Sequence, residues 1–128
     1  MKKLVFLLLA VMMLTACGQD TEKDQGAVYV NITAEEAKRI MDTEEGYIIL
    51  DVREQDEYDA GHISGAILIP YTQMEEKAEE VLTDKDQLIL VYCRSGRRSK
   101  IAAEALVELG YTNIKEFGGI IDWPYEVE

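Results

Sequence analysis

The chain has 128 residues, which suits one small domain with room for a targeting segment. Hydrophobic residues make up 48% of it, enough for one core, and 25 acidic against 13 basic residues give a net charge of −12. A surface this acidic repels nucleic acid and anionic lipid headgroups, so the composition argues against nucleic-acid binding.

The amino end has the features of a secretory leader. Lys2 and Lys3 precede an apolar run, Leu4–Leu14, which is short for a membrane span but suits the core of a secretory signal. The run leads into Leu14-Thr-Ala-Cys17. This motif resembles the lipobox of bacterial lipoproteins, in which the leader is cut before a cysteine that then carries lipid. The resemblance implies a signal peptide over residues 1–16 and lipidation of Cys17; an uncleaved membrane anchor is the alternative.

Residues 17–27 are polar and charged, with no apolar period, and predict a flexible tether. In either case the domain is expected outside the cytoplasm, in the cell envelope and tethered to a membrane. If Cys17 carries lipid, Cys93 is the only free thiol and no internal disulfide can form.

Strands and helices are predicted to alternate from residue 28 onward. Thr33-Ala-Glu-Glu36 is a capping box that starts the first helix. Gly46 ends that helical region, and Pro70 stops a later strand. The expected strands here are Val28–Ile32, Tyr47–Leu50, Ala66–Ile69 and Asn113–Phe117, and further helical segments are expected over Glu54–Tyr58 and Thr72–Leu82.

The stretch from Leu88 to Leu109 organises the rest of the chain. Leu88–Tyr92 is a continuous apolar run, typical of a strand buried on both faces of a parallel sheet. A short loop, Cys93–Arg98, follows it. Ser99–Leu109 then predicts a helix whose buried face comprises the residues Ile101, Ala102, Ala105, Leu106 and Leu109.

This alternation predicts an α/β domain over residues 28–128, with a parallel sheet covered by helices on both faces. Sites in such sheets form outside the carboxyl ends of the strands. The pattern therefore places Asp51, Arg53 and Cys93 at one edge of the sheet, where a buried pair between Asp51 and an arginine would fix the geometry of the loop.

A cysteine between a strand end and a helix start is suited to ionisation. Unpaired backbone N–H groups and the helix dipole favour negative charge there, and Arg94, Arg97 and Arg98 add full positive charges. We therefore expect the pKa of Cys93 to lie below its ordinary value. The alternative is a buried structural cysteine, but such residues have apolar neighbours, whereas Cys93 is followed by arginines.

Two separated motifs identify a family resemblance. The first comprises Asp51-Val-Arg-Glu54, Glu57-Tyr58, Gly61-His-Ile63, Gly65-Ala66 and Pro70; the second is Cys93-Arg-Ser-Gly-Arg-Arg-Ser99. Together with Gly118-Gly-Ile120 and Trp123, they make the chain resemble a single-domain rhodanese, a sulfurtransferase. The resemblance implies a rhodanese-like, five-stranded, mostly parallel sheet. It also implies that Cys93 takes sulfur from a donor such as thiosulfate or polysulfide, becomes a persulfide, and passes the sulfur to a thiophilic acceptor.

The resemblance also implies roles for neighbouring residues. The backbone N–H groups of the loop would surround the persulfide, so the substrate-binding candidates are Arg94, Ser95, Gly96, Arg97, Arg98 and Ser99. Arg98 would bind the anionic end of the donor or the loop itself, whereas Arg94 and Arg97 could face the anion or solvent. Asp51 and Arg53 would support the site from behind. His62 is expected to be structural, and neither a metal nor an organic cofactor is expected.

Two other functions share some of these features. A phosphatase or arsenate reductase also uses a cysteine-and-arginine loop, but a tyrosine-phosphatase loop has five residues between the two and here only four separate Cys93 from Arg98. A non-catalytic binding module or persulfide carrier is the other alternative, although Cys93 is present. The expected partners are a small sulfur-containing anion, a thiol acceptor and a membrane reached through lipid on Cys17. The domain itself is expected to be a monomer.

Overall fold

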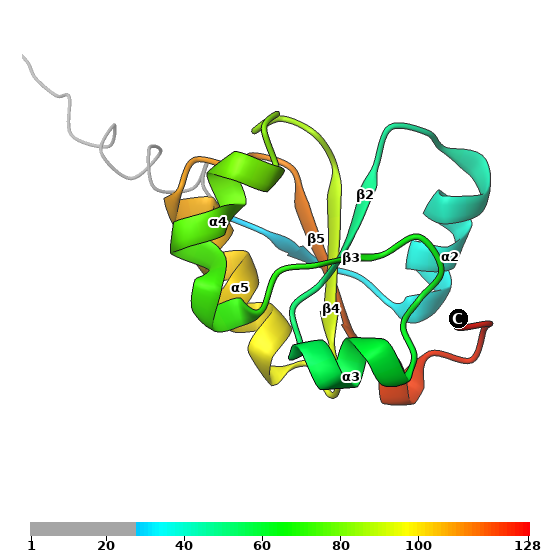
Figure 1. The fold of residues 1–128 in the computed structure, drawn as a ribbon. Coiled ribbons are helices and arrows are strands. Elements are labelled where there is room, and N and C mark those ends of the chain that lie inside the picture. The colour runs from blue at the N-terminus through cyan, green and yellow to red at the C-terminus, as the bar shows by residue number, and fades with distance from the viewer. Residues whose placement is uncertain (1–27) are drawn as a thin grey trace, which may run out of the picture.

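The computed structural model describes residues 28–128; the predicted leader, Cys17 and the whole tether lie outside them. Five strands form one sheet in the order β1-β5-β4-β2-β3, and every neighbouring pair is parallel. The predicted α/β fold is thus confirmed (Figure 1). The strands are β1 (Val30–Asn31), β2 (Ile48–Asp51), β3 (Ile67–Leu68), β4 (Ile89–Cys93) and β5 (Ile114–Gly119).

Helices cover both faces of this sheet, α2 on one side and α4 and α5 on the other (Figure 1). The helices are α2 (Ala34–Thr43), α3 (Gln55–Ala60), α4 (Met74–Val81) and α5 (Arg97–Glu108), with short 3₁₀ turns η1 (Tyr71–Gln73) and η2 (Ile120–Asp122). Strand β4 is buried throughout and divides its side chains between two apolar clusters. Val91 and Cys93 join the cluster under α4 and α5, and Leu90 and Tyr92 join the one under α2.

Local signals account for several element boundaries. The predicted capping box forms, because the Thr33 hydroxyl accepts from Glu36 N–H while the Glu36 carboxylate accepts from Thr33 N–H. The first strand is shorter than predicted, since only Val30 and Asn31 pair with β5 at the edge of the sheet. Among residues 28–128, no helix has the length and apolar character needed to cross a bilayer.

Helix α5 differs from its predicted form in two ways. It begins at Arg97 rather than Ser99, because Gly96 adopts a left-handed conformation (φ 111°) and turns the chain into the helix early. Ile101, predicted on the buried face, is 40% exposed, and Ala103 is buried instead. The buried face follows Ser99, Ala102, Ala103 and Leu106. The hydrophobic pattern predicted the wrong buried face for α5 because Ser99 is a polar residue, whereas its hydroxyl points toward the interior.

The carboxyl ends of the strands lie at one edge of the sheet. Helix α3, which follows β2, and the start of α5, which follows β4, both lie at this edge, the lower one in Figure 1. The structure therefore brings Asp51, Arg53 and Cys93 to the same edge, as the alternation of strands and helices predicts.

Candidate active site

Cys93 is the last residue of β4, and its sulfur faces backbone N–H groups of the loop that follows. The Gly96 N–H donates to Sγ at 3.0 Å, and hydrogen bonds from the Ser95 and Ser99 backbone also reach the sulfur. Residues at the start of a helix have no intrahelical partner for their N–H groups, so these donors are available to a ligand. We refer to residues 93–99 as the sulfur loop.

The thiol of Cys93 is buried, yet its pKa is lowered. Cys93 is only 1% exposed and belongs to the apolar cluster under α5, so the sequence-based argument that it lacks apolar neighbours is wrong. Burial by itself raises the pKa of Cys93. Hydrogen bonds from the Ser99 side chain and from the backbone of Ser99, Gly96 and Ser95 outweigh burial, and the net pKa lies below its ordinary value.

The arginines of the sulfur loop have different environments. The guanidinium of Arg98, predicted to bind the donor or the loop, is held by both carboxylate oxygens of Glu57 in α3, at 2.8 and 2.9 Å. The hydrogen bond from Arg98 holds the pKa of Glu57 well below its usual range, at about 2. Arg94 and Arg97 are exposed, and Arg97 lies 6.0 Å from the centre of the Tyr71 ring. Arg94 and Arg97 are therefore the arginines of the sulfur loop that face solvent.

Strand β5 forms the wall behind the loop. Cys93 pairs with Gly119 across a register shift, and the Ile121 N–H donates to the Arg94 carbonyl at 3.2 Å. A Cβ atom on Gly119 would lie only 1.9 Å from that carbonyl oxygen. The sulfur loop can lie this close to β5 only because residue 119 has no side chain. Gly119 belongs to the motif Gly118-Gly-Ile120, from which no role for this residue was predicted.

A buried carboxylate, absent from the sequence-based site, also lies in β5. Glu116 is 0% exposed, and its Oε2 accepts hydrogen bonds from the Ser99 hydroxyl and from the Gly118 N–H at 2.9 Å. The Ser99 oxygen in turn lies 3.4 Å from the sulfur of Cys93. The only signal available in the sequence was that Glu116 alternates with the apolar Ile114 in an expected strand, so the two side chains share one face.

Asp51 and Arg53 form a buried ion pair at the end of β2. The closest contact joins Arg53 Nη2 and Asp51 Oδ2 at 2.7 Å, and the side chains are 6% and 0% exposed. Asp51 also accepts from the Tyr92 hydroxyl at 2.6 Å, and Arg53 donates to the Gly61 carbonyl. The expected pair therefore exists, but it ties β2 to β4 and to the turn at Gly61 and makes no hydrogen bond to the sulfur loop.

His62 lies outside the sulfur loop. Its ring stacks on Tyr58 with centroids 3.8 Å apart, and its Nδ1 lies 3.0 Å from the Tyr58 carbonyl oxygen. Its backbone exchanges two hydrogen bonds with Glu128. This placement agrees with a structural position for His62 in the turn before β3.

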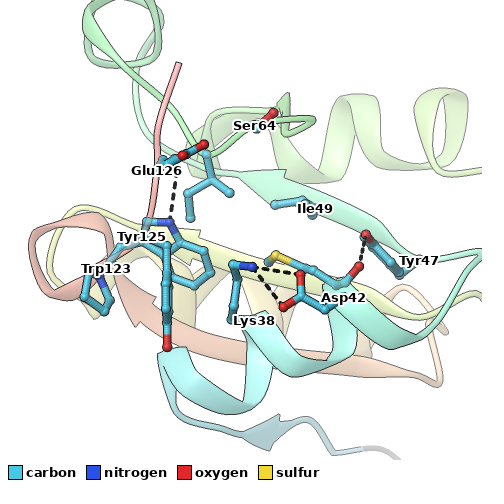
Figure 2. Close-up of a pocket in the computed structure, with 11 residues that line it drawn as sticks. Lys38, Asp42, Tyr47, Ile49, Ser64, Trp123, Tyr125 and Glu126 are labelled. Atoms are coloured by element: carbon cyan, nitrogen blue, oxygen red, sulfur yellow. Dashed lines mark hydrogen bonds and ion pairs between the residues drawn. The ribbon is translucent and has the colours of Figure 1, made fainter.

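Two grooves adjoin the carboxyl-terminal segment. The larger, about 810 Å³, lies between α2 and residues 123–126, and Cys93 is not among its lining residues (Figure 2). Several of its polar groups bind each other: Lys38 pairs with Asp42, and the Trp123 indole donates to the Glu126 carbonyl. A smaller groove of about 450 Å³ is lined by Arg94, Glu57 and residues 120–121, so it borders the sulfur loop.

Comparison with known proteins identifies the family of this domain. Residues 33–124 match the rhodanese-like domain family. The chain belongs to this family. The match covers every element from α2 to η2, including the sulfur loop and the Asp51–Arg53 pair.

Named relatives of this rhodanese-like chain include two bacterial proteins. It is 40% identical over 73 residues to the thiosulfate sulfurtransferase PspE of Escherichia coli, covering 57% of this chain and 70% of that protein. It is 34% identical over 112 residues to the putative sulfur carrier protein YrkF of Bacillus subtilis, covering 87% of this chain but only 60% of that protein.

Solved structures show the same fold. A rhodanese-related protein from Thermoplasma volcanium superposes with a TM-score of 0.68 at 33% identity, covering 78% of this chain and 98% of that one. A rhodanese from E. coli with anions gives a TM-score of 0.60 at 35% identity, covering 64% and 96%.

Proposed function

We propose that this rhodanese-like domain is a sulfurtransferase that moves sulfane sulfur through a persulfide on Cys93. With thiosulfate, the Cys93 thiolate attacks the outer sulfur, the S–S bond of the donor breaks, and sulfite leaves with the bonding electron pair. A thiophilic acceptor such as cyanide or a thiolate then attacks the outer sulfur of the persulfide. Cys93 leaves as a thiolate and is ready for another cycle.

The observation that carries this proposal is the Gly96 N–H, which donates to Sγ at 3.0 Å, together with the backbone of Ser95 and Ser99, which also lowers the pKa of Cys93. A persulfide anion is large and diffusely charged, so several converging donors suit it and stabilise the negative charge as it develops. These donors are held by the backbone and need no rearrangement during the reaction.

The exposed arginines support an anionic donor. Arg94 and Arg97 lie in the sulfur loop, and neither takes part in the Glu57 pair that engages Arg98. In a chain of net charge −12 they provide local positive charge for an anion such as thiosulfate. We assign the first contact with the anionic end of the donor to Arg94 and Arg97.

A persulfide carrier is the second candidate, because one relative is named a putative sulfur carrier protein and aligns over 87% of this chain. In that case Cys93 would form the persulfide and a partner protein would remove the sulfur. We further propose that the domain works in the cell envelope, anchored to a membrane by lipid on Cys17, as the motif Leu14-Thr-Ala-Cys17 suggests.

The test compares the wild-type protein with Cys93→Ser. Thiosulfate treatment should add one sulfur atom to the peptide containing Cys93, and cyanide should then release thiocyanate over many cycles. The variant should show neither, and a phosphomonoester should not be hydrolysed by either protein. A persulfide that forms but does not turn over with cyanide or small thiols supports the carrier. Full activity in Cys93→Ser would refute the assigned nucleophile.

A further inference from the structure

A fully buried carboxylate lies behind the sulfur, and the proposed transfer gives it no role. Glu116 in β5 is 0% exposed, at a place where a strand side chain facing the interior is normally apolar. Burying a carboxylate costs free energy unless hydrogen bonds compensate. The arrangement around Glu116 therefore needs an explanation beyond packing.

Both oxygens of Glu116 are occupied. Oε1 accepts from Asn31 Nδ2 at 2.6 Å, and Oε2 accepts from the Gly118 N–H and from the Ser99 hydroxyl. The ammonium of Lys100, a half-exposed side chain on α5, lies 3.8 Å from Oε1. The carboxylate is thus fixed in one orientation, with Oε2 aimed at Ser99.

Ser99 joins this carboxylate to the nucleophile. Its oxygen lies within hydrogen-bond distance of Glu116 Oε2 and 3.4 Å from Cys93 Sγ, with the thiol placed to donate. A hydroxyl can accept a proton from one neighbour while giving its own to another. Thiol, hydroxyl and carboxylate therefore form a continuous hydrogen-bonded chain in the interior.

We propose that Glu116 takes up the proton of Cys93 through Ser99 when the thiolate forms. The S–H bond breaks and leaves its electron pair on sulfur. The proton goes to the Ser99 oxygen, while the proton of that hydroxyl moves to Oε2 of Glu116. No charge leaves the interior, and the reverse movement restores the thiol. Ser99 touches the reacting sulfur, whereas Glu116 acts through Ser99.

The titratable neighbours of this hydrogen-bonded chain lie on α5, on α3 and just before β1. Arg98 of α5, with Glu57 of α3 bound to it, acts on Cys93. Lys100 of α5 faces Glu116, and burial and the charges of Glu104 and Glu116 raise the pKa of Tyr29, just before β1. Of these neighbours only Glu104 is changed, in the control variant, so differences between the other profiles report on Glu116 and Ser99.

A proton shared between two groups leaves a specific signature in a pH profile. Cys93 and Glu116 together hold one proton over a range of pH, so a constant fraction of Cys93 stays as thiolate across that range. The reactivity of Cys93 therefore reaches a plateau there. The test measures alkylation of Cys93 by iodoacetamide from pH 5 to 9, without sulfur donor, read by mass spectrometry of the Cys93 peptide. The full chain is used, and site-resolved detection separates Cys93 from Cys17.

Wild-type protein should keep such a plateau at acidic pH. In Glu116→Gln the amide accepts no proton, so the rate should fall tenfold for each pH unit below the thiol titration and be about tenfold lower at pH 6. Glu104→Gln, an exposed position on α5, is the matched control and should follow wild type.

If Glu116 acts only by its charge, removing that charge makes Cys93 easier to ionise. An equal or faster rate in Glu116→Gln would overturn the proposal.

Further variants and a labelling measurement keep the proposal testable if Glu116→Gln fails to fold. Glu116→Asp keeps a carboxylate and should retain part of the plateau, while Ser99→Ala should lose it. In wild-type protein with ¹³C-labelled glutamate, alkylating Cys93 removes the shared proton, so the titration of the Glu116 carboxyl carbon should change; an unchanged titration overturns the proposal. The inference rests on the proposed function only for the biological purpose of the proton path. A plateau in reactivity without sulfur transfer would support the proton path and refute the proposed function. Sulfur transfer without a plateau would support the proposed function and refute the proton path.

Discussion

The two polar clusters at the carboxyl edge of the sheet use charge in opposite ways. At the end of β2, Asp51, Arg53 and Tyr92 satisfy one another, and both charged side chains are almost fully buried. At the end of β4, the Cys93 sulfur is met by backbone N–H groups, and Arg94 and Arg97 remain exposed. At this edge paired charges hold the architecture, while backbone dipoles stabilise negative charge on the sulfur of Cys93. Three substitutions test this difference.

The largest effect is expected at the β2 cluster. Asp51→Asn leaves the Arg53 guanidinium buried without its counter-charge, which should lower the free energy of unfolding by about 3–5 kcal/mol. Chemical denaturation measures this directly. Asp42→Asn is the matched control, because solvent screens the exposed Lys38–Asp42 pair and its loss should change the free energy of unfolding far less. Equal losses in the two variants would mean that the β2 cluster does not hold the edge together.

A smaller effect, on activity rather than folding, is expected at the wall behind the sulfur. In Gly119→Ala the new methyl group meets the Arg94 carbonyl, so the sulfur loop must move. A displacement of about 1 Å can lower a rate about a hundredfold, and we expect that loss in persulfide formation per folded molecule. The control is Gly46→Ala, where the backbone has φ +80° but nothing lies within 4 Å of the new methyl group, and it should lose stability only. Unchanged persulfide formation in Gly119→Ala would argue against a preformed set of donors.

The smallest effect is expected at the Arg98–Glu57 ion pair, which joins the start of α5 to α3. Because Arg98 lowers the pKa of Glu57 in the fold, to about 2, the pair stabilises the protein above the ordinary carboxyl pKa of 4.5. That stabilisation is lost as the pH falls from 4.5 to about 2. For a partly exposed pair we expect about 1 kcal/mol.

Denaturant unfolding of Glu57→Gln and wild type at pH 7 and at low pH tests this. The difference in unfolding free energy should be present at pH 7 and vanish near pH 2, and exposed Glu80→Gln should show no such dependence. A difference that stays constant across this range would show that Glu57 acts without its charge.

The sequence predicted those parts of the fold and site that depend on local patterns. Apolar runs give the parallel strands, and the capping box gives the start of α2. The position of Cys93 between β4 and α5 also follows from neighbouring residues. Roles for Arg98 and Ser99 depended on the resemblance to a family, and the site residues remain predictions until variants are assayed.

Contacts made over long separations could not be read from these patterns. The partner of Arg98, Glu57, is 41 residues away, and the partner of Ser99, Glu116, is 17 residues away on another strand. Each pairing exists only because the sheet order brings α3 and β5 beside the start of α5. The same reason explains Ile101: the inward Ser99 hydroxyl, bound to β5, sets the rotation of α5 and leaves Ile101 in solvent.

The dependence of the sulfur loop on main-chain donors has an evolutionary consequence. Ser95 and Gly96 contribute N–H groups, and the side chains of Arg94 and Arg97 extend outward from the same loop. If the domain has the proposed function, mutations at Arg94 and Arg97 would alter which donor is selected while the peptide geometry at the sulfur stays constant. Selectivity and reactivity would then be encoded by separate atoms of one short segment, which would allow a lineage to explore new sulfur sources without rebuilding its reactive centre.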